Sequence, residues 1–185
     1  MMRNCGFDSV TIFAECSPTT ISPPWPGMKA WSTELFLGLS AKGWGMVSPE
    51  LFRRFMFPHL QRLSQLAHDY GLLVQLHCCG GVAPLIPMMI EAGVDGLHAV
   101  QTTCFGMGLA ELKQAFGAEI LFNGGIDSHH ILIDGTPDLV REQTLAALKI
   151  MAPGGGYVAG ASHDSILEET PVQNVLTMFD AVAQF

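Results

Sequence analysis

A short apolar run followed by an amphipathic segment recurs about five times along this 185-residue chain. The runs have strand length and the amphipathic segments have helix length. The chain has no convincing signal for a β-hairpin. Alternation of this kind is typical of a parallel sheet covered by helices, because each strand needs a crossover connection to reach the next one. The expected strands are 9–14, 72–77, 96–100, 119–122 and 156–159, and the expected helices are 49–70, 82–92, 109–116, 137–151 and 171–183.

Capping residues support three of the helix starts. Ser48 followed by Pro49 predicts an N-cap and a first helical residue. Thr136 and Thr170 each precede a proline and are the expected N-caps of the last two helices. With right-handed crossovers, these units form either an open doubly wound sheet or part of a closed barrel.

The segment 16–47 interrupts this rhythm. It is rich in Pro and Gly and contains all three tryptophans, Trp25, Trp31 and Trp44. Connections of this length are uncommon unless they serve as lids, binding loops or interfaces. A poorly ordered insertion is the alternative, although three indole rings are of little use to a solvated linker.

Composition excludes several classes of protein. The formal net charge of −8 argues against a nucleic-acid-binding surface. No apolar stretch approaches the ~20 residues that span a bilayer. The five cysteines form an odd set, and the first residues have no apolar secretory segment. We therefore expect a cytoplasmic protein whose cysteines do metal or thiolate chemistry.

The candidate functional residues follow the strands. In parallel α/β folds the working side chains lie at the carboxyl ends of the strands. In this sequence those positions are polar, glycine-rich or able to bind metal. They are Glu15 and Cys16, His77 to Gly81, Gln101, Asn123 to Asp127, and Ser162 to Asp164.

His77 and Cys79 form the most informative pair. Residues i and i+2 of a strand point to the same side, so the imidazole and the thiolate converge there. Zinc binds this mixture of nitrogen and sulfur ligands, and a catalytic zinc takes three protein ligands. Packing of a strand-end histidine beside small cysteines is the alternative interpretation. Cys78 faces the opposite side and is expected to pack in the core.

Other strand ends supply candidate catalytic and substrate-binding residues. His163, Asp127 and Glu15 are the candidate acid, base or orienting groups. His163 and Asp127 could instead cap a loop and a helix. Gln101 is expected to contact substrate through its amide. Gly124 and Gly125 are expected to lie against the substrate as well. Cys104 would reach the metal only if its loop folds inward.

The strand ends and their neighbouring turns also form an ordered set of motifs. The set comprises Ser48-Pro49-Glu50, His77-Cys78-Cys79-Gly80, Gly93-Val94-Asp95, Val100-Gln101, Gly124-Gly125-Ile126-Asp127, Gly135-Thr136-Pro137, Gly154-Gly155-Gly156-Tyr157, Ser162-His163, Thr170-Pro171 and Asn174. Taken together, it resembles the uroporphyrinogen decarboxylase and corrinoid methyltransferase superfamily. The resemblance begins near Phe7 and is weakest in the segment 16–47.

The resemblance implies a (β/α)₈ barrel with its site at the strand carboxyl ends. Such barrels need ~250 residues, so residues 1–185 would form a single partial domain comprising the last five or so units. The chain would then be a truncated product, a fragment, or a half completed by a complementing chain or a homo-oligomer. A missing half would also account for the 49% hydrophobic and 14% charged composition.

The His-x-Cys-Gly element is similar to the corrinoid methyltransferase branch. There, His-x-Cys and a later Cys bind zinc, which activates a thiol to accept a corrinoid-bound methyl group. This resemblance implies zinc at His77 and Cys79 and a corrinoid protein as partner. The sequence departs from the pattern because no Cys follows Cys104, which leaves His163 or Asp164 as the third ligand.

Two other interpretations stay open. His163 resembles a histidine near the last strand of the uroporphyrinogen decarboxylases, which implies a carboxy-lyase acting on a tetrapyrrole without metal. The essential aspartate and arginines of those enzymes belong to the N-terminal part of the barrel, outside the resemblance. The third interpretation is a non-catalytic half-barrel that needs a partner chain.

Overall fold

The computed structural model describes residues 11–13, 32–36 and 47–185 of the chain. Its sheet has six strands in the order β1-β2-β3-β4-β5-β6, which is also their order in the sequence. β1 (Thr11–Phe13) pairs antiparallel with β2 (Ser32–Phe36). From β2 onward every neighbouring pair is parallel, through β3 (Leu73–His77), β4 (Gly96–Val100), β5 (Leu121–Ile126) and β6 (Tyr157–Ala161).

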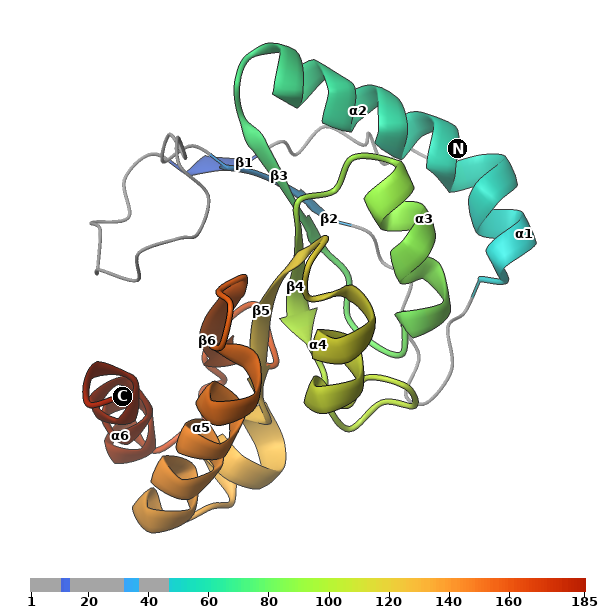
Figure 1. Ribbon diagram of the computed structural model, residues 1–185. Coiled ribbons are helices and arrows are strands. Elements are labelled where there is room, and N and C mark those ends of the chain that lie inside the picture. The colour runs from blue at the N-terminus through green and yellow to red at the C-terminus, as the bar shows by residue number, and fades with distance from the viewer. Residues whose placement is uncertain (1–10, 14–31, 37–46) are drawn as a thin grey trace, which may run out of the picture.

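Helices follow each strand from β2 onward, as in successive β/α units. Figure 1 shows α2, α3 and α4 following one another along one side of the sheet, and α5 and α6 continue the series at the β6 end. Their bounds are α1 Pro49–Leu51, α2 Phe57–Asp69, α3 Ile86–Glu91, α4 Leu109–Phe116, α5 Pro137–Met151 and α6 Val172–Ala183. The predicted parallel β/α fold class is confirmed.

Two predictions about the first hundred residues need correction. The segment 16–47 was expected to be one long connection, but it contains β2, which pairs with β3. The first predicted strand, at 9–14, is described only at Thr11–Phe13, where it runs antiparallel to β2 and so does not begin a parallel β/α unit. The tryptophans of this segment lie outside the described residues.

The helix expected at 49–70 has an interruption. Ser48 caps its start, since the Ser48 hydroxyl accepts from the Leu51 N–H at 3.3 Å. Between α1 and α2 the turns widen into a π-helical segment, Phe52–Met56, in which the Phe57 N–H bonds to the Phe52 carbonyl. Pro58 follows directly and has no N–H to donate, so a regular ladder cannot pass through this point.

The caps of the last two helices differ from each other. Thr136 caps α5 as predicted, its hydroxyl accepting from the Leu139 N–H at 3.3 Å. Thr170 does not cap α6, so that prediction was wrong. The N-cap is Pro171, whose backbone is still extended and whose carbonyl accepts from the Asn174 N–H at 2.9 Å. The helix therefore starts at Val172.

The main core lies between the sheet and the helices. Leu76, Leu97 and Phe122, from three adjacent strands, are fully buried against Ile86 and Met89 of α3. Because neighbouring strands are in register, alternate residues point away from this core to the opposite face of the sheet. That face carries polar side chains and positions the candidate site.

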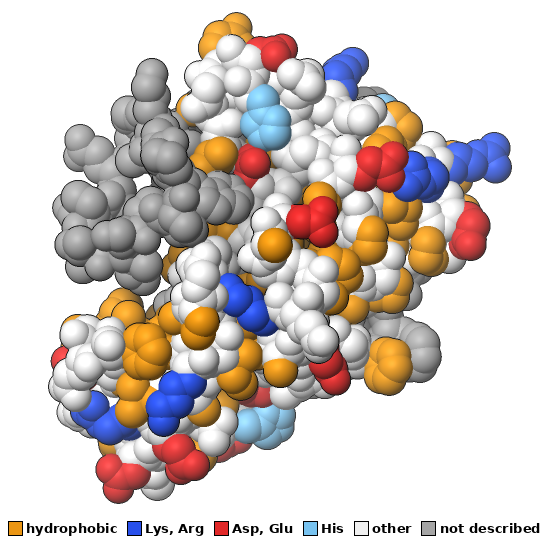
Figure 2. Space-filling model, viewed as in Figure 1, with side chains coloured by type: hydrophobic (Ala, Val, Ile, Leu, Met, Phe, Trp, Pro, Cys, Tyr) orange, Lys and Arg blue, Asp and Glu red, His pale blue; other side chains and the backbone are white. Residues whose placement is uncertain are grey.

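The surface provides two further observations. On the face shown in Figure 2, the acidic and basic side chains of the described residues are scattered among hydrophobic and neutral ones, without a continuous basic patch. The expectation that the protein does not bind nucleic acid rests on its net charge and stays a prediction. Within the described ranges, no helix is both long enough and apolar enough to cross a membrane.

Candidate metal and active site

The sheet face opposite the helices has a polar row. Gln75 and His77 alternate with buried apolar residues on β3, and His98 and Asn123 occupy the same face on β4 and β5. The Asn123 amide donates to Gln75 Oε1 at 3.1 Å, across the intervening Gly96 of β4. Parallel strands buried on both faces are usually apolar throughout, so these polar residues mark a face with a different use.

His77 and Cys79 meet at the carboxyl end of β3. His77 Nε2 lies 3.1 Å from Cys79 Sγ. The imidazole is 8% exposed and the thiol is half-buried, while Cys78 between them is fully buried on the core side. The i, i+2 argument therefore predicted the directions of all three side chains correctly.

The other ring nitrogen of His77 faces β4. His77 Nδ1 lies 3.0 Å from Nδ1 of His98, the residue directly opposite in the β3–β4 register. Sequence reasoning missed His98. The available signal was a polar residue inside an otherwise buried strand, but the strand register that pairs it with His77 cannot be read from one sequence.

Gln101 holds the turn that follows Cys79. Its Oε1 accepts from the Gly80 N–H at 2.8 Å, and the Cys104 thiol lies 3.9 Å from the same oxygen. The side-chain oxygen predicted to contact substrate is therefore already engaged with the backbone next to Cys79. Cys104 thus lies beside the Gln101 oxygen that accepts from Gly80.

Cys79 lies in an environment that disfavours a bare thiolate. Burial raises the pKa of its thiol above the ordinary value, and the negative charges of Asp164 and Cys104 raise it further. In the absence of a cation, Cys79 is therefore a neutral thiol at pH 7. Metal coordination reverses this balance, because a bound dication deprotonates its thiol ligand.

Two side chains, those of His77 and Cys79, are placed to bind one metal ion. His77 and Cys79 supply nitrogen and sulfur close enough to share one ion, since tetrahedral zinc separates such ligands by roughly 3.5 Å. No group of three His, Cys, Asp or Glu side chains among the described residues is arranged to hold a metal. The structure thus brings together one nitrogen and one sulfur donor, one fewer than the three protein ligands of a catalytic zinc.

His163 and Asp164 follow β6. His163 Nδ1 lies 2.6 Å from Asp164 Oδ1, and the Ser165 N–H lies 3.4 Å from the same ring nitrogen. Both side chains are partly exposed. The negative charge of Asp164 also contributes to the raised pKa of the Cys79 thiol.

Asp127 caps the turn that follows β5. Its Oδ1 accepts from the backbone N–H groups of His129 and His130 at 2.8 Å each, and Oδ2 lies 3.0 Å from His130 Nδ1. This cap opens a π-helical segment, Ser128–Ile133, that the sequence did not predict. Burial acts to raise the pKa of Asp127, but these hydrogen bonds outweigh it and hold the pKa below its ordinary value.

Gly124 and Gly125 lie within β5 rather than in a turn after it. The Gly124 carbonyl accepts from the buried Tyr157 hydroxyl at 2.9 Å. A methyl group on Gly124, which has φ +116°, would lie 2.7 Å from the Val100 amide nitrogen. Their packing is therefore tight. Glu15, the remaining predicted catalytic residue, lies outside the described residues.

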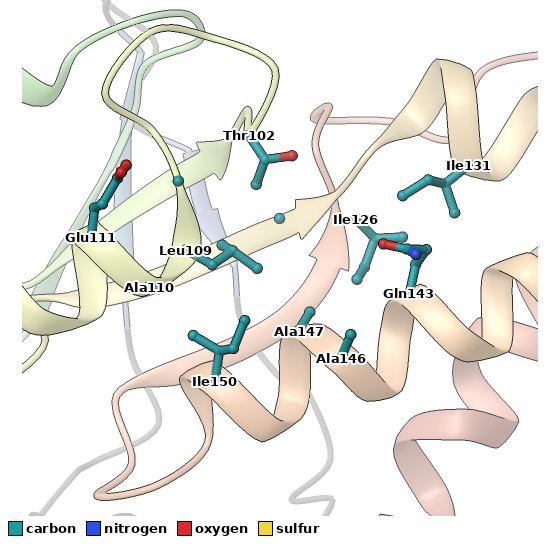
Figure 3. Close-up of a pocket in the computed structure, with 12 residues that line it drawn as sticks. Thr102, Leu109, Ala110, Glu111, Ile126, Ile131, Gln143, Ala146, Ala147 and Ile150 are labelled. Carbon is teal, nitrogen blue, oxygen red and sulfur yellow. The ribbon is translucent and has the colours of Figure 1, made fainter.

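A hollow of about 380 Å³ opens between α4, α5 and the end of β5. Figure 3 shows Leu109, Ile126 and Ile150 around its apolar floor, with Glu111 and Gln143 at the sides. Among the predicted site residues that the structure describes, Gly125 alone lines it, and neither His77 nor Cys79 does. The hollow is thus distinct from the His77–Cys79 pair.

Comparison with known proteins places this site in a family. The family model described as "Uroporphyrinogen decarboxylase (URO-D)" matches residues 38–185. Methylcobamide:CoM methyltransferase MtaA of Methanosarcina barkeri is 27% identical over 140 residues, which cover 74% of this chain and 37% of that protein. A uroporphyrinogen decarboxylase of Thermus thermophilus is 28% identical over 140 residues, 76% of this chain and 38% of the relative.

A solved structure is also similar. It is a methyltransferase from Methanosarcina mazei, with a TM-score of 0.66 and 24% identity, covering 83% of this chain and 42% of the other. At this identity the likeness shows the fold alone. The chain spans about two fifths of the length of the proteins it matches.

Proposed function

This chain belongs to the uroporphyrinogen decarboxylase family, and we propose that it is a zinc-dependent methyltransferase-type domain that transfers a methyl group from a corrinoid to a thiol. The observation that carries the proposal is the 3.1 Å approach of His77 Nε2 and Cys79 Sγ at the end of β3. The names of two groups of relatives, methylcobamide:CoM methyltransferase and methylated-thiol–coenzyme M methyltransferase, support the same chemistry.

His77 and Cys79 would hold the zinc. The third ligand is to be sought among Cys104, His163 and Asp164, because Cys104 and Asp164 influence the Cys79 thiol and His163 is paired with Asp164. When bound, zinc lowers the pKa of a coordinated substrate thiol and makes it a thiolate at neutral pH.

The rest of the reaction is a simple displacement. The substrate thiolate sulfur attacks the methyl carbon, a carbon–sulfur bond forms, and the carbon–cobalt bond breaks with its electron pair left on the corrinoid. The thiol proton leaves to solvent or to a base, for which His163, Asp127 and Glu15 remain the candidates. A corrinoid protein is the proposed partner, and it would present the methyl group at the carboxyl ends of the strands.

Methyl transfer from free methylcobalamin to coenzyme M tests the proposal. We expect the zinc-loaded chain to consume methylcobalamin absorbance and to form the thioether in equal amount. Cys79→Ser and His77→Ala should abolish turnover, whereas Cys78→Ala, which changes the adjacent core cysteine, should retain it. Turnover that survives Cys79→Ser would contradict the proposal.

Decarboxylation of a tetrapyrrole is the second candidate function. The similarity to the Thermus thermophilus decarboxylase, at 28% identity over 140 residues, supports it. In that mechanism His163 and Asp127 would act on substrate and no metal would be needed. Carbon dioxide release from uroporphyrinogen by metal-free protein, lost in His163→Ala but not in Cys79→Ser, would select this function.

A further inference from the structure

We infer that His98 is a positioning residue for His77: it holds the His77 ring so that Nε2 is the unprotonated nitrogen facing Cys79. The inference rests on the proposed function, because it gives a role to a neighbour of the proposed zinc ligands. The observation behind it is the 3.0 Å separation of the two Nδ1 atoms.

The two histidines are fixed by the sheet. His77 and His98 are directly paired residues of parallel neighbours β3 and β4, so both side chains leave the same face at the same level. Their rings meet edge to face, with centroids 5.0 Å apart and planes inclined by 64°. The pair closes the β3–β4 register, after Gln75 with Gly96 and Leu76 with Leu97, and the Cys78 N–H bonds to the His98 carbonyl directly beyond it.

Metal binding through Nε2 requires one of the two arrangements that the contact between the two Nδ1 atoms allows. A neutral imidazole has one N–H and one lone pair. If the His77 hydrogen is on Nδ1, it donates to His98 Nδ1, and His77 Nε2 can accept from the Cys79 thiol 3.1 Å away. In the reverse arrangement His98 Nδ1 donates to His77 Nδ1, and the hydrogen on His77 Nε2 leaves that nitrogen without a lone pair for a metal.

This arrangement suits metal binding. A histidine ligand binds metal through one ring nitrogen and usually donates the other N–H to an orienting group, whose removal typically costs about 10- to 100-fold in metal affinity. β4 would supply two such supports, because Gln101 also fixes Gly80, the residue after Cys79. The β4 strand end would thus orient both members of the pair.

Zinc competition with a chromophoric chelator tests the role of His98 on the full chain. We expect His98→Leu to weaken zinc binding by about 10- to 100-fold. In His98→Asn the amide oxygen can still accept from His77 Nδ1, so this variant should stay within a few-fold of the unmodified chain. His59→Leu, which changes an exposed histidine of α2, is the matched control and should have no effect. Equal affinity in His98→Leu and the unmodified chain would overturn the inference.

A second measurement leaves His98 unchanged. Long-range ¹H–¹⁵N NMR of the metal-free chain, with His77 assigned from a His77→Gln spectrum, reports which ring nitrogen carries the hydrogen. We expect the hydrogen on Nδ1, and a hydrogen on Nε2 would overturn the inference even if His98→Leu fails to fold. If the unmodified chain binds no zinc while His77 has the expected tautomer, the metal proposal fails and the positioning role stands.

Discussion

The side-chain oxygen of Gln101 accepts a hydrogen bond from the backbone N–H of Gly80 at 2.8 Å, which ties the end of β4 to the turn after Cys79. Gly80 is buried, so this N–H has little access to water as an alternative partner. The geometry of the His77–Cys79 pair therefore depends on a residue one strand away.

Replacing Gln101 with Leu should destabilise the protein. The buried Gly80 N–H would lose its partner, which costs about 1–3 kcal/mol. Gln101→Glu keeps an acceptor oxygen at the same place and should cost less. Urea unfolding of the two variants measures the difference. If Gln101→Leu has the same free energy of unfolding as the unmodified chain and only weakens substrate binding, Gln101 contacts substrate and does not stabilise the turn after Cys79.

Asp127 should contribute stability that depends on pH. Asp127→Ala removes the cap of the 128–133 segment and should cost about 0.5–2 kcal/mol at neutral pH. Because hydrogen bonds lower the pKa of Asp127 in the folded state, its contribution is complete above the ordinary carboxyl value of 3.8 and is lost as the pH falls through the lower folded-state pKa.

Acid unfolding curves of the unmodified chain, Asp127→Ala and Asp127→Asn check this sign. The gap between the unmodified chain and Asp127→Ala should close as the pH falls. Asn retains a capping oxygen without the charge, so Asp127→Asn should lie between them. A gap that widens toward acid would contradict the assignment.

Gly124 should tolerate a methyl group far less well than Gly154. Both have positive φ, +116° and +77°, but the space around Gly154 is open while Gly124 faces the Val100 amide nitrogen at 2.7 Å. Gly154→Ala should cost about 1–2 kcal/mol, from the backbone conformation alone. Gly124→Ala adds the steric clash, and we expect more than about 3 kcal/mol. Equal melting temperatures for the two variants would refute the close approach.

Asp164 should matter to metal binding more than Cys104. Its charge contributes more than that of Cys104 to the raised pKa of the Cys79 thiol, and the same carboxylate would attract a dication to the pair. We expect Asp164→Asn to weaken zinc binding at least about tenfold and Cys104→Ser to change it by only a few-fold. Chelator competition at fixed pH compares them, and the opposite order would make Cys104 the third ligand.

Much of the fold was predictable because local signals agreed with tertiary structure. Thr136 followed by Pro137 indicated the start of α5, and the helices expected at 109–116 and 137–151 have the bounds of α4 and α5. β5 was predicted too short, because Gly124 and Gly125 resemble a turn. In the structure both glycines remain in the ladder, paired with Ala159 and Gly160 of β6.

The candidate site was predictable only where it depends on one strand. His77 and Cys79 converge because of strand alternation, which the sequence contains. The His98 contact depends on the register between β3 and β4, and the position of β2 depends on pairing with β3; neither is encoded by local spacing. Asp127 shows the same limit. An aspartate that follows a Gly-Gly sequence can cap a turn or bind substrate, and the residue type alone does not distinguish the two roles.

The most direct test of the central claim is zinc content, measured by elemental analysis on monodisperse chain purified without oxygen, beside Cys79→Ser and Cys78→Ala. The account predicts zinc near one equivalent in the unmodified chain and in Cys78→Ala, and its loss in Cys79→Ser. Zinc retained by folded Cys79→Ser, or absent from the folded unmodified chain after reconstitution, would contradict a metal centre at His77 and Cys79.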